Sequence, residues 1–135
     1  INLKGGVDTL TLANVVNTGT IAGVEKLNGG TAADTVTIST SVTNGIINLG
    51  TGTDSLTLTG TLNSLKVSNV ETLTGGAGSD SITNTGTNSM TFAGGGGFDT
   101  YIAGTGVDTV VVGNVGVSDV VTVKSFRVAG ADKIA

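Results

Sequence analysis

The sequence lacks cysteine, histidine, tryptophan and proline, and its 135 residues include only three phenylalanines and one tyrosine. Without cysteine and histidine the chain can form no disulfide, imidazole base or zinc site with thiolate or imidazole ligands, so we expect no enzyme. Charged residues make up 12% of the chain, the net charge is −4, and there is no basic run. We therefore expect no nucleic-acid partner. No stretch approaches the roughly 20 apolar residues that cross a bilayer as a helix, so we expect no membrane insertion.

Glycine, in contrast, is abundant, with 23 residues, and the mean hydropathy is +0.33. This composition indicates one ordered, regular and turn-rich domain rather than a disordered chain. The sequence starts with INLKGG and ends with DKIA, both in mid-pattern, and shows neither an initial Met nor a signal peptide. We therefore expect it to be a piece of a longer polypeptide.

Two stretches of the chain recur at the same offset of 46 residues. INLKGGVDTLTL at 1–12 recurs as INLGTGTDSLTL at 47–58, and VEKLNGGTAADTVT at 24–37 recurs as VETLTGGAGSDSIT at 70–83. Because two independent stretches share one offset, we interpret it as a real period containing two related units. Six aspartates are each followed by Ser or Thr and then by an apolar residue: Asp8, Asp34, Asp54, Asp80, Asp99 and Asp108.

The residues after these aspartates alternate with period two, as in Leu56 and Leu58, which predicts strands with one buried face. Glycine-rich segments before them predict turns. A unit of about 20 to 26 residues is too short to bury a face alone, so identical units must stack. The sequence predicts an all-β, right-handed parallel β-solenoid or β-roll of about five or six coils over residues 1–118. Residues 119–135 are predicted to be a C-terminal cap or exit segment.

GGAGSDSIT at 75–83 and GGGGFDTYI at 94–102 match the nonapeptide G-G-x-G-x-D-x-U-x, where U is a large apolar residue. Residues 103–111 lack only its first glycine. These motifs resemble the RTX family, the hemolysin-type calcium-binding repeats, and most closely the strand-rich repeats of large secreted bacterial surface proteins. The resemblance covers residues 1–111 and is strongest over 70–111. In that family a segment similar to residues 123–134 often closes the roll.

The resemblance implies that the glycine- and aspartate-rich turns bind Ca²⁺. Calcium takes six to eight oxygens from carboxylates and carbonyls, so a turn stacked one coil away should complete each site. The best expected ligands come from three turns, followed by two weaker ones: Gly75, Gly76, Gly78 and Asp80; Gly94, Gly95, Gly97 and Asp99; Gly104, Gly106 and Asp108; then Gly50, Gly52 and Asp54; Gly29, Gly30 and Asp34.

Leu49 replaces the first glycine before Asp54, and two further turns depart from the motif. Lys4 stands where a glycine is expected before Asp8, so this site should be weak or empty, and Lys4 could balance the carboxylate. Ala32 stands at another glycine position, where a positive φ would strain the turn before Asp34. All these aspartates also fit ordinary turn chemistry, in which Asp bonds to nearby backbone.

Two further features have both a structural and a functional interpretation. Glu25 and Glu71 are equivalent in the repeat and could act as hydrolytic carboxylates, but a structural role on a solvated face is favoured, since no second acid lies beside either. Threonine pairs could form flat outward ranks that bind ice or glycan, although Thr is also a common exposed strand residue. These pairs are Thr9 and Thr11, Thr35 and Thr37, Thr57 and Thr59, and Thr72 and Thr74.

The first functional hypothesis is a calcium-stabilised structural segment of a bacterial extracellular or cell-surface protein, such as an S-layer protein, adhesin stalk or extracellular filament. Low cytosolic calcium would keep the chain loose for type I secretion, and external calcium would fold it. Its partners would be calcium ions and further repeats or copies of the chain. The alternatives are a C-terminal RTX secretion and folding domain of a secreted hydrolase, which the flanking sequence would reveal, and the ice- or glycan-binding solenoid.

Overall fold

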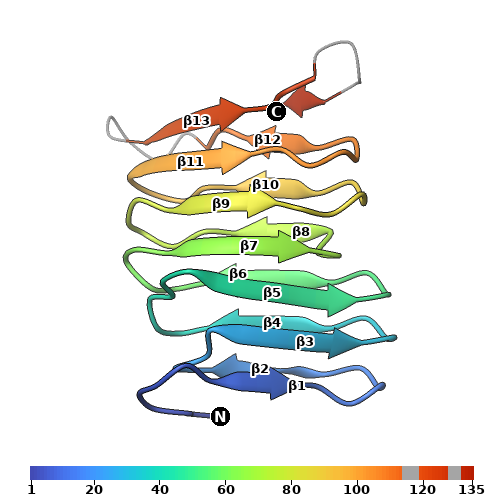
Figure 1. Ribbon diagram of the computed structural model, residues 1–135. Helices are drawn as coiled ribbons and strands as arrows, with labels where there is room; N and C mark the ends of the chain where they lie inside the picture. Colours follow the sequence, from blue (N-terminus) through green and yellow to red (C-terminus); the bar gives the residue numbers. More distant parts are fainter. Residues whose placement is uncertain (114–118, 128–131) are drawn as a thin grey trace.

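The alternating apolar residues form short parallel strands, as their period of two predicts. The computed structural model describes residues 1–113, 119–127 and 132–135, and this part of the chain consists of strands and turns (Figure 1). Successive strands run in opposite directions on opposite sides of the molecule while the chain rises. In Figure 1 the front strands run left to right and the rear strands right to left, so the coil is right-handed.

The strands form two seven-stranded parallel sheets, one from the odd-numbered and one from the even-numbered strands. The odd sheet contains, in spatial order, β1 (Thr9–Thr11), β3 (Lys26–Gly30), β5 (Gly45–Gly50), β7 (Ser64–Ser68), β9 (Ser81–Asn84), β11 (Phe98–Ile102) and β13 (Val120–Lys124). The even sheet contains β2 (Thr18–Ile21), β4 (Thr35–Ile38), β6 (Ser55–Leu58), β8 (Thr72–Thr74), β10 (Thr91–Ala93), β12 (Thr109–Val111) and β14 (Lys133–Ile134). One odd and one even strand make one coil, and β13 lies six coil steps above β1, so the predicted all-β parallel solenoid of about five or six coils is confirmed.

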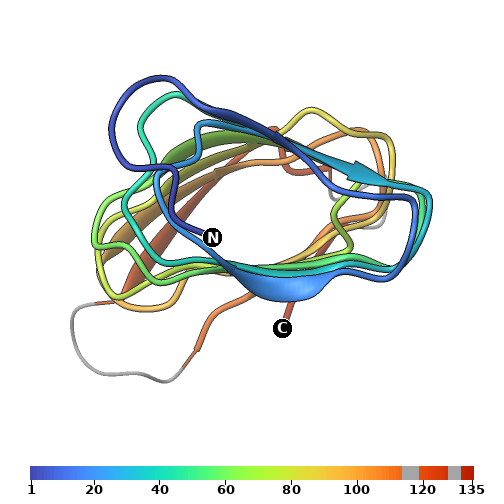
Figure 2. The same ribbon diagram turned by 90° about the horizontal axis from the view of Figure 1, so that it is seen from below.

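Figure 2, seen along the coil axis, shows the two sheets as the long sides of a flattened loop. Because equivalent strands pair in register, apolar side chains stack in columns between the sheets. Leu56, for example, lies between Val36 and Leu73 in the even sheet, and all three are buried. Burying such side chains contributes about 1.5–3 kcal/mol each, which compensates for the scarcity of aromatic residues.

Two of the few aromatic side chains nevertheless lie in this core. Phe92 of β10 and Tyr101 of β11 face each other across the interior, with ring centroids 4.7 Å apart and planes inclined by 13°. Both rings are fully buried. Stacked rings of this kind add about 0.5–1.5 kcal/mol beyond the area that they bury.

The C-terminal strands continue both sheets. β13 pairs with β11, and β14 pairs with β12, both in parallel. The boundary predicted after residue 118 adjoins residues 114–118, which lie outside the described residues. In residues 1–113, 119–127 and 132–135 there is no helix long and apolar enough to cross a bilayer.

The 46-residue period corresponds to five half-coils. Residues 26–37 form β3 and β4, and their repeat equivalents form β8 and β9, so each equivalent strand lies in the other sheet. The basic repeat is therefore one turn followed by one strand. The two related units of the period are therefore unequal: three strands lie between Asp8 and Asp34, and two lie between Asp34 and Asp54.

Candidate functional site

Rows of polar side chains follow both edges of the solenoid, where the chain passes between the sheets. Asp54 shows the arrangement: its Oδ1 accepts the Asp34 backbone N–H of the preceding coil at 2.7 Å. The Asp34 carbonyl in turn accepts the Ser55 N–H at 2.8 Å. We call these rows the first and second ladders. The first contains Asp8, Glu25, Val42, Asn63, Asp80 and Asp99, and the second contains Asn17, Asp34, Asp54, Glu71, Met90, Asp108 and Asp132. Val42 and Met90 are apolar and take part through their backbone N–H alone.

The same side-chain bond recurs along both ladders. In each case a side-chain oxygen accepts the backbone N–H of the equivalent residue one coil earlier, 17 to 24 residues before it. Each bond satisfies a buried or partly buried backbone donor that the sheets leave unpaired at the corner. The bonds are Asp8 N to Glu25 Oε2 (2.8 Å), Asn17 N to Asp34 Oδ1 (2.9 Å), Asp34 N to Asp54 Oδ1 (2.7 Å), Val42 N to Asn63 Oδ1 (3.1 Å), Asp54 N to Glu71 Oε2 (2.7 Å), Asn63 N to Asp80 Oδ1 (2.9 Å), Asp80 N to Asp99 Oδ1 (2.9 Å), Met90 N to Asp108 Oδ1 (3.0 Å) and Asp108 N to Asp132 Oδ1 (3.0 Å).

Glu25 and Glu71 are thus ladder residues, and the carboxylate of each accepts the backbone N–H of the aspartate one coil earlier. Sequence reasoning did not assign Asn17 and Asn63 to the ladders either, although each donates its N–H and its Nδ2 to one aspartate. The spacing of these residues in the sequence could have identified them as ladder members. Asp8 precedes Glu25 by 17 residues, and Asn17 precedes its aspartate by the same 17.

The two complete nonapeptide turns, 75–80 and 94–99, stack directly on each other. The Gly96 N–H donates to the Gly76 carbonyl at 3.1 Å, and a methyl group on Gly95 would overlap that same oxygen. Asp80 and Asp99 are adjacent members of the first ladder. The structure therefore brings together the two turns that the motif ranks highest, one coil apart as the shared-site hypothesis requires.

The remaining predicted turns lie on the other edge. Turns 29–34 and 50–54 stack on each other, so Asp34 and Asp54 form a second stacked pair. The turn before Asp108 stacks instead on residues 86–90, where Met90 holds the ladder position. Asp108 thus lacks an acidic partner in the preceding coil.

The buried carboxylates differ in their free oxygens. Asp108 is saturated: its Oδ2 accepts the Tyr101 hydroxyl and the Gly104 N–H, both at 2.9 Å. Asp80 Oδ2 accepts the Gly76 N–H at 3.0 Å. In contrast, one buried oxygen has no hydrogen-bond donor in each of five aspartates: Asp8, Asp34, Asp54, Asp99 and Asp119. Free coordination capacity therefore lies at Asp99, Asp34 and Asp54 rather than at Asp108.

The surroundings of Asp99 and Asp54 raise the pKa of both carboxylates. Burial raises the pKa of Asp99, with the charges of Asp80 and Asp119 adding to the increase. Burial also raises the pKa of Asp54, and the charges of Glu71 and Asp34 add to it. In both, the N–H of the preceding ladder residue acts in the opposite direction. Each site thus favours a proton or a cation over a bare anion.

Asp119 is a second acidic residue near turn 94–99 that the motif did not identify, because Val rather than Ser or Thr follows it. Its Oδ1 accepts the Gly97 N–H at 3.1 Å, and its Oδ2 is buried without a donor. Asp119, Gly94 and Gly95 help to line a cavity of about 190 Å³. No group of three or more Asp, Glu, His or Cys side chains suited to a metal occurs in the described residues, so a cation here would also need backbone carbonyls.

The two departures from the motif have different outcomes. Lys4 adopts φ 70°, close to the φ of 90° at its repeat equivalent Gly50. Lys4 makes no ion pair with Asp8: the one salt bridge among the described residues joins Arg127 Nε and Asp132 Oδ2 at 3.8 Å. Ala32 is not among the positive-φ residues, so the expected strain is absent.

The threonine pairs fall on different faces. Thr35, Thr37, Thr57, Thr72 and Thr74 lie on the outer face of the even sheet, in register across successive strands. The pair at 9 and 11 lies on β1 of the odd sheet instead. Thr59 follows β6 and is therefore not part of the ranks. The outward residue of β6 that pairs with Thr72 is Ser55.

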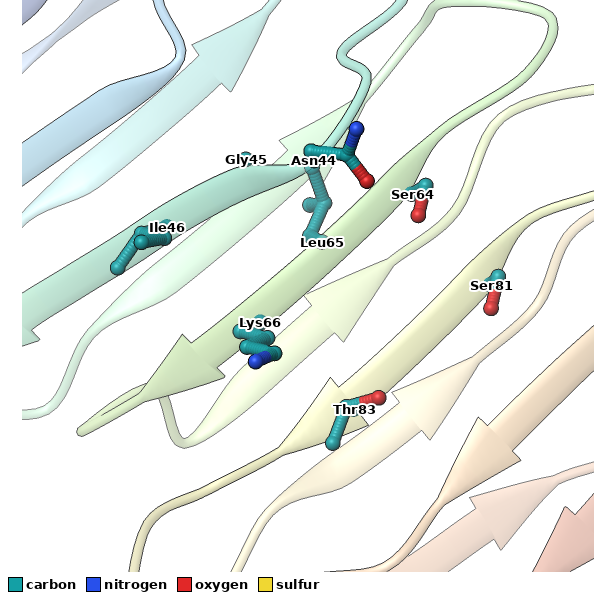
Figure 3. Close-up of a pocket in the computed structure, with 8 residues that line it drawn as sticks. All are labelled: Asn44, Gly45, Ile46, Ser64, Leu65, Lys66, Ser81 and Thr83. Carbon is teal, nitrogen blue, oxygen red and sulfur yellow. The ribbon is translucent and has the colours of Figure 1, made fainter.

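A shallow groove of about 220 Å³ crosses the outer face of the odd sheet (Figure 3). Lys66 pairs in register with Ile46 on one side and with Thr83 on the other. The lining contains hydroxyl, amide and ammonium groups but no aromatic ring on which a sugar could stack: Asn44, Gly45, Ile46, Ser64, Leu65, Lys66, Ser81 and Thr83. The groove therefore adds nothing to the glycan-binding alternative.

Comparison of the chain with protein-family models, curated proteins and solved structures found no match.

Proposed function

We propose that the chain is a calcium-stabilised, non-enzymatic structural segment of a secreted bacterial surface protein, such as an S-layer protein, adhesin stalk or extracellular filament. The observation that carries this proposal is the set of buried carboxylate oxygens without a donor, on Asp34, Asp54, Asp99 and Asp119. A buried, uncompensated charge costs several kcal/mol. Calcium suits these edges because it accepts carboxylate and carbonyl oxygens together in a flexible geometry.

The residues that would hold the ion are Asp99, Asp119 and the carbonyls of the stacked turns 75–80 and 94–99. Bound calcium supplies positive charge between successive coils, so binding and coil stacking occur together. At the other edge, Asp34 and Asp54 with their turns form the second candidate pair. In low calcium the carboxylate rows repel one another, which suits export of a loose chain by a type I system, and external calcium completes folding.

The test is a calcium titration followed by far-ultraviolet circular dichroism and urea unfolding. We expect β-structure and the urea midpoint to increase with millimolar calcium and to fall in excess chelator. Magnesium is the matched control ion, because it demands a small octahedral site and retains its waters. A full β-spectrum with the same urea midpoint in chelator and in calcium would refute the proposal.

An Asp99→Asn variant separates a metal site from a purely structural ladder. Asn keeps the oxygen that accepts the Asp80 N–H at 2.9 Å but removes the buried charge. We expect the variant to be at least as stable as the parent in chelator at pH 7, and to gain less stability from calcium. An unchanged calcium response would show that Asp99 is not a ligand.

The threonine ranks favour a second candidate function, binding to ice. Along β2, β4, β6, β8, β10 and β12 the two outward columns are Thr18, Thr35, Ser55, Thr72, Thr91 and Thr109, and Thr20, Thr37, Thr57, Thr74, Ala93 and Val111. Strands about 4.8 Å apart and alternate residues about 7 Å apart make this a regular, uncharged lattice with a hydroxyl at every position except Ala93 and Val111.

Ice binding is tested by placing a bulky side chain within the lattice. Thr57→Tyr interrupts one column, whereas Thr9→Tyr changes a threonine on the opposite sheet. We expect the parent and Thr9→Tyr to slow ice recrystallisation and Thr57→Tyr to lose this activity. If the parent chain does not affect ice growth, this second function is rejected.

A further inference from the structure

The fully exposed charged side chains of this molecule have the opposite sign to its net charge. The chain has ten acidic and six basic residues, which gives a net charge of −4. Every acidic side chain is buried or half-buried, whereas all the lysines are exposed: Lys4, Lys26, Lys66, Lys124 and Lys133. A molecule that approaches the surface therefore meets mainly ammonium groups.

Three of these lysines lie in one outward column of the odd sheet. The strand register gives the order of this column as Thr9, Lys26, Ile46, Lys66, Thr83, Ile102 and Lys124. At about 4.8 Å per strand, Lys26 and Lys66 are roughly 10 Å apart, and Lys66 and Lys124 are roughly 14 Å apart. The strands of this sheet contain one acidic residue, Asp99, and it is buried. The salt bridge found among the described residues does not involve these lysines, so their charge is available to a partner.

Exposed apolar side chains lie between and beside the lysines on the same face. Ile46 holds the column position between Lys26 and Lys66 and is 50% exposed. Phe98 pairs in register with Val120, and these side chains are 66% and 47% exposed. Removing such side chains from water is favourable. The face therefore combines cationic groups with apolar anchors, the two features that hold a protein on an anionic lipid surface.

The shallow groove at Lys66 adds donors that suit a phosphate group. Ile46, Lys66 and Thr83 lie side by side on β5, β7 and β9 (Figure 3). The hydroxyl groups of Ser64 and Ser81 also line this groove of about 220 Å³. Hydroxyl and ammonium groups both donate to phosphate oxygens. A lipid phosphate can thus be held here while the isoleucine beside it contacts the acyl chains.

Other occupants fit this face less well. A second copy of the chain would bring lysines against lysines, because its own carboxylates are equally buried or half-buried. A polyphosphate or nucleic acid would meet the three charges but would leave Ile46 and Phe98 in water. On the even sheet, the outer face carries the threonine ranks and a single lysine, Lys133, which pairs in register with Thr109. The combination of charge and apolar anchors therefore belongs to one side of the solenoid.

We propose that the outer face of the odd sheet docks on a lipid surface that bears anionic phosphate headgroups, without crossing it. Lys26, Lys66 and Lys124 contact the headgroups. Ile46 and Phe98 enter the boundary between headgroups and acyl chains. A lysine near an anionic surface strengthens binding by about fivefold, so the three together give about a hundredfold. This role goes beyond the calcium-stabilised fold and requires only that the coils are folded.

The test is co-sedimentation of the folded chain with lipid vesicles at one fixed calcium concentration. One set contains phosphatidylcholine alone, and the other contains equal parts of phosphatidylcholine and phosphatidylglycerol. We expect binding to the anionic vesicles, weakened in 1 M salt, where the screening length falls from about 8 Å to about 3 Å. Equal binding to both sets, or binding to inorganic polyphosphate but to neither set, would overturn the proposal. A chain that folds without calcium, against the first proposal, is assayed in chelator with the same expected result.

Lys66→Gln and Lys133→Gln form a matched pair, because both remove one exposed charge but from opposite sheets. We expect Lys66→Gln to weaken binding to the anionic vesicles by about fivefold and Lys133→Gln to leave it unchanged. Phe98→Ser keeps the charge and should weaken binding severalfold. The urea midpoints should match that of the parent, since all three side chains are exposed. Equal losses for the two lysine variants would show that net charge, and not this face, controls binding, and the proposal would be wrong.

Discussion

The run of four glycines at 94–97 gives a sharp test of how the turns stack. A methyl group at Gly95 would lie closer than 3.0 Å to the Gly76 carbonyl of the preceding turn, and Gly95 has φ +91°. At Gly96 the nearest atom is 3.3 Å away, the Ala77 carbonyl oxygen, and no positive φ is required. Gly96 is the variable position of the nonapeptide, and Ala77 holds it in the preceding turn. We therefore expect Gly95→Ala to destabilise the fold and Gly96→Ala to be tolerated.

The expected loss for Gly95→Ala has two parts. Placing a side chain at a positive φ costs about 1–2 kcal/mol. Overpacking against a backbone that cannot move freely costs a further 1–3 kcal/mol or so. The total of about 2–5 kcal/mol is a large share of the roughly 5–15 kcal/mol that stabilises a typical domain. For Gly96→Ala the loss of unfolded-state entropy favours folding by about 0.4–1 kcal/mol, which offsets the slightly tight contact.

Urea unfolding followed by circular dichroism measures both variants at fixed calcium. With a slope of about 1–3 kcal/mol per molar urea, Gly95→Ala should lower the midpoint by about 1 M or more. Gly96→Ala should shift it by a few tenths of a molar at most. Equal losses in the two variants would refute the stacking of turns 75–80 and 94–99.

Two further predictions concern the buried polar groups. Because the folded-state pKa values of Asp54 and Asp99 are raised above the ordinary 3.8, the folded chain binds their protons more tightly than the unfolded chain. The urea midpoint in chelator should therefore rise as the pH falls from 7 through these raised values, and Asp54→Asn should reduce the rise; a flat profile would contradict the prediction. Tyr101→Phe keeps the ring stack on Phe92 but removes the hydroxyl that donates to Asp108 at 2.9 Å. It should cost about 1–3 kcal/mol by urea unfolding, and an unchanged midpoint would show that this hydroxyl contributes nothing to stability.

The sequence predicted the fold well because its signals are local. Alternation around Leu56 and Leu58 requires a strand with one buried face, and a glycine-rich segment ending in an aspartate requires a turn. Repetition of these two elements leaves stacking as the way to bury the apolar face. The all-β parallel solenoid with about six coils follows from these signals, and the structure confirms it.

The candidate site was harder to predict because the ladders depend on which residues stack in space. Glu25 and Asn63 do not share the local context of the aspartates, yet both hold rungs. Asp108 has that context in full, but the Tyr101 hydroxyl and backbone donors occupy its carboxylate. Coils of 17 to 24 residues place the acidic turns on either edge, and a local motif carries no information about the edge on which its turn falls.

The five-half-coil period has a consequence for how such a chain can change in length. Inserting a single 46-residue unit would rotate everything after it by half a turn about the solenoid axis. A column of threonines continued across that junction would pass to the face that carries Lys26 and Lys66. Two units inserted together would restore the original phase. The parity of the unit count therefore determines whether the chain keeps one chemically uniform side along its length or alternates between two.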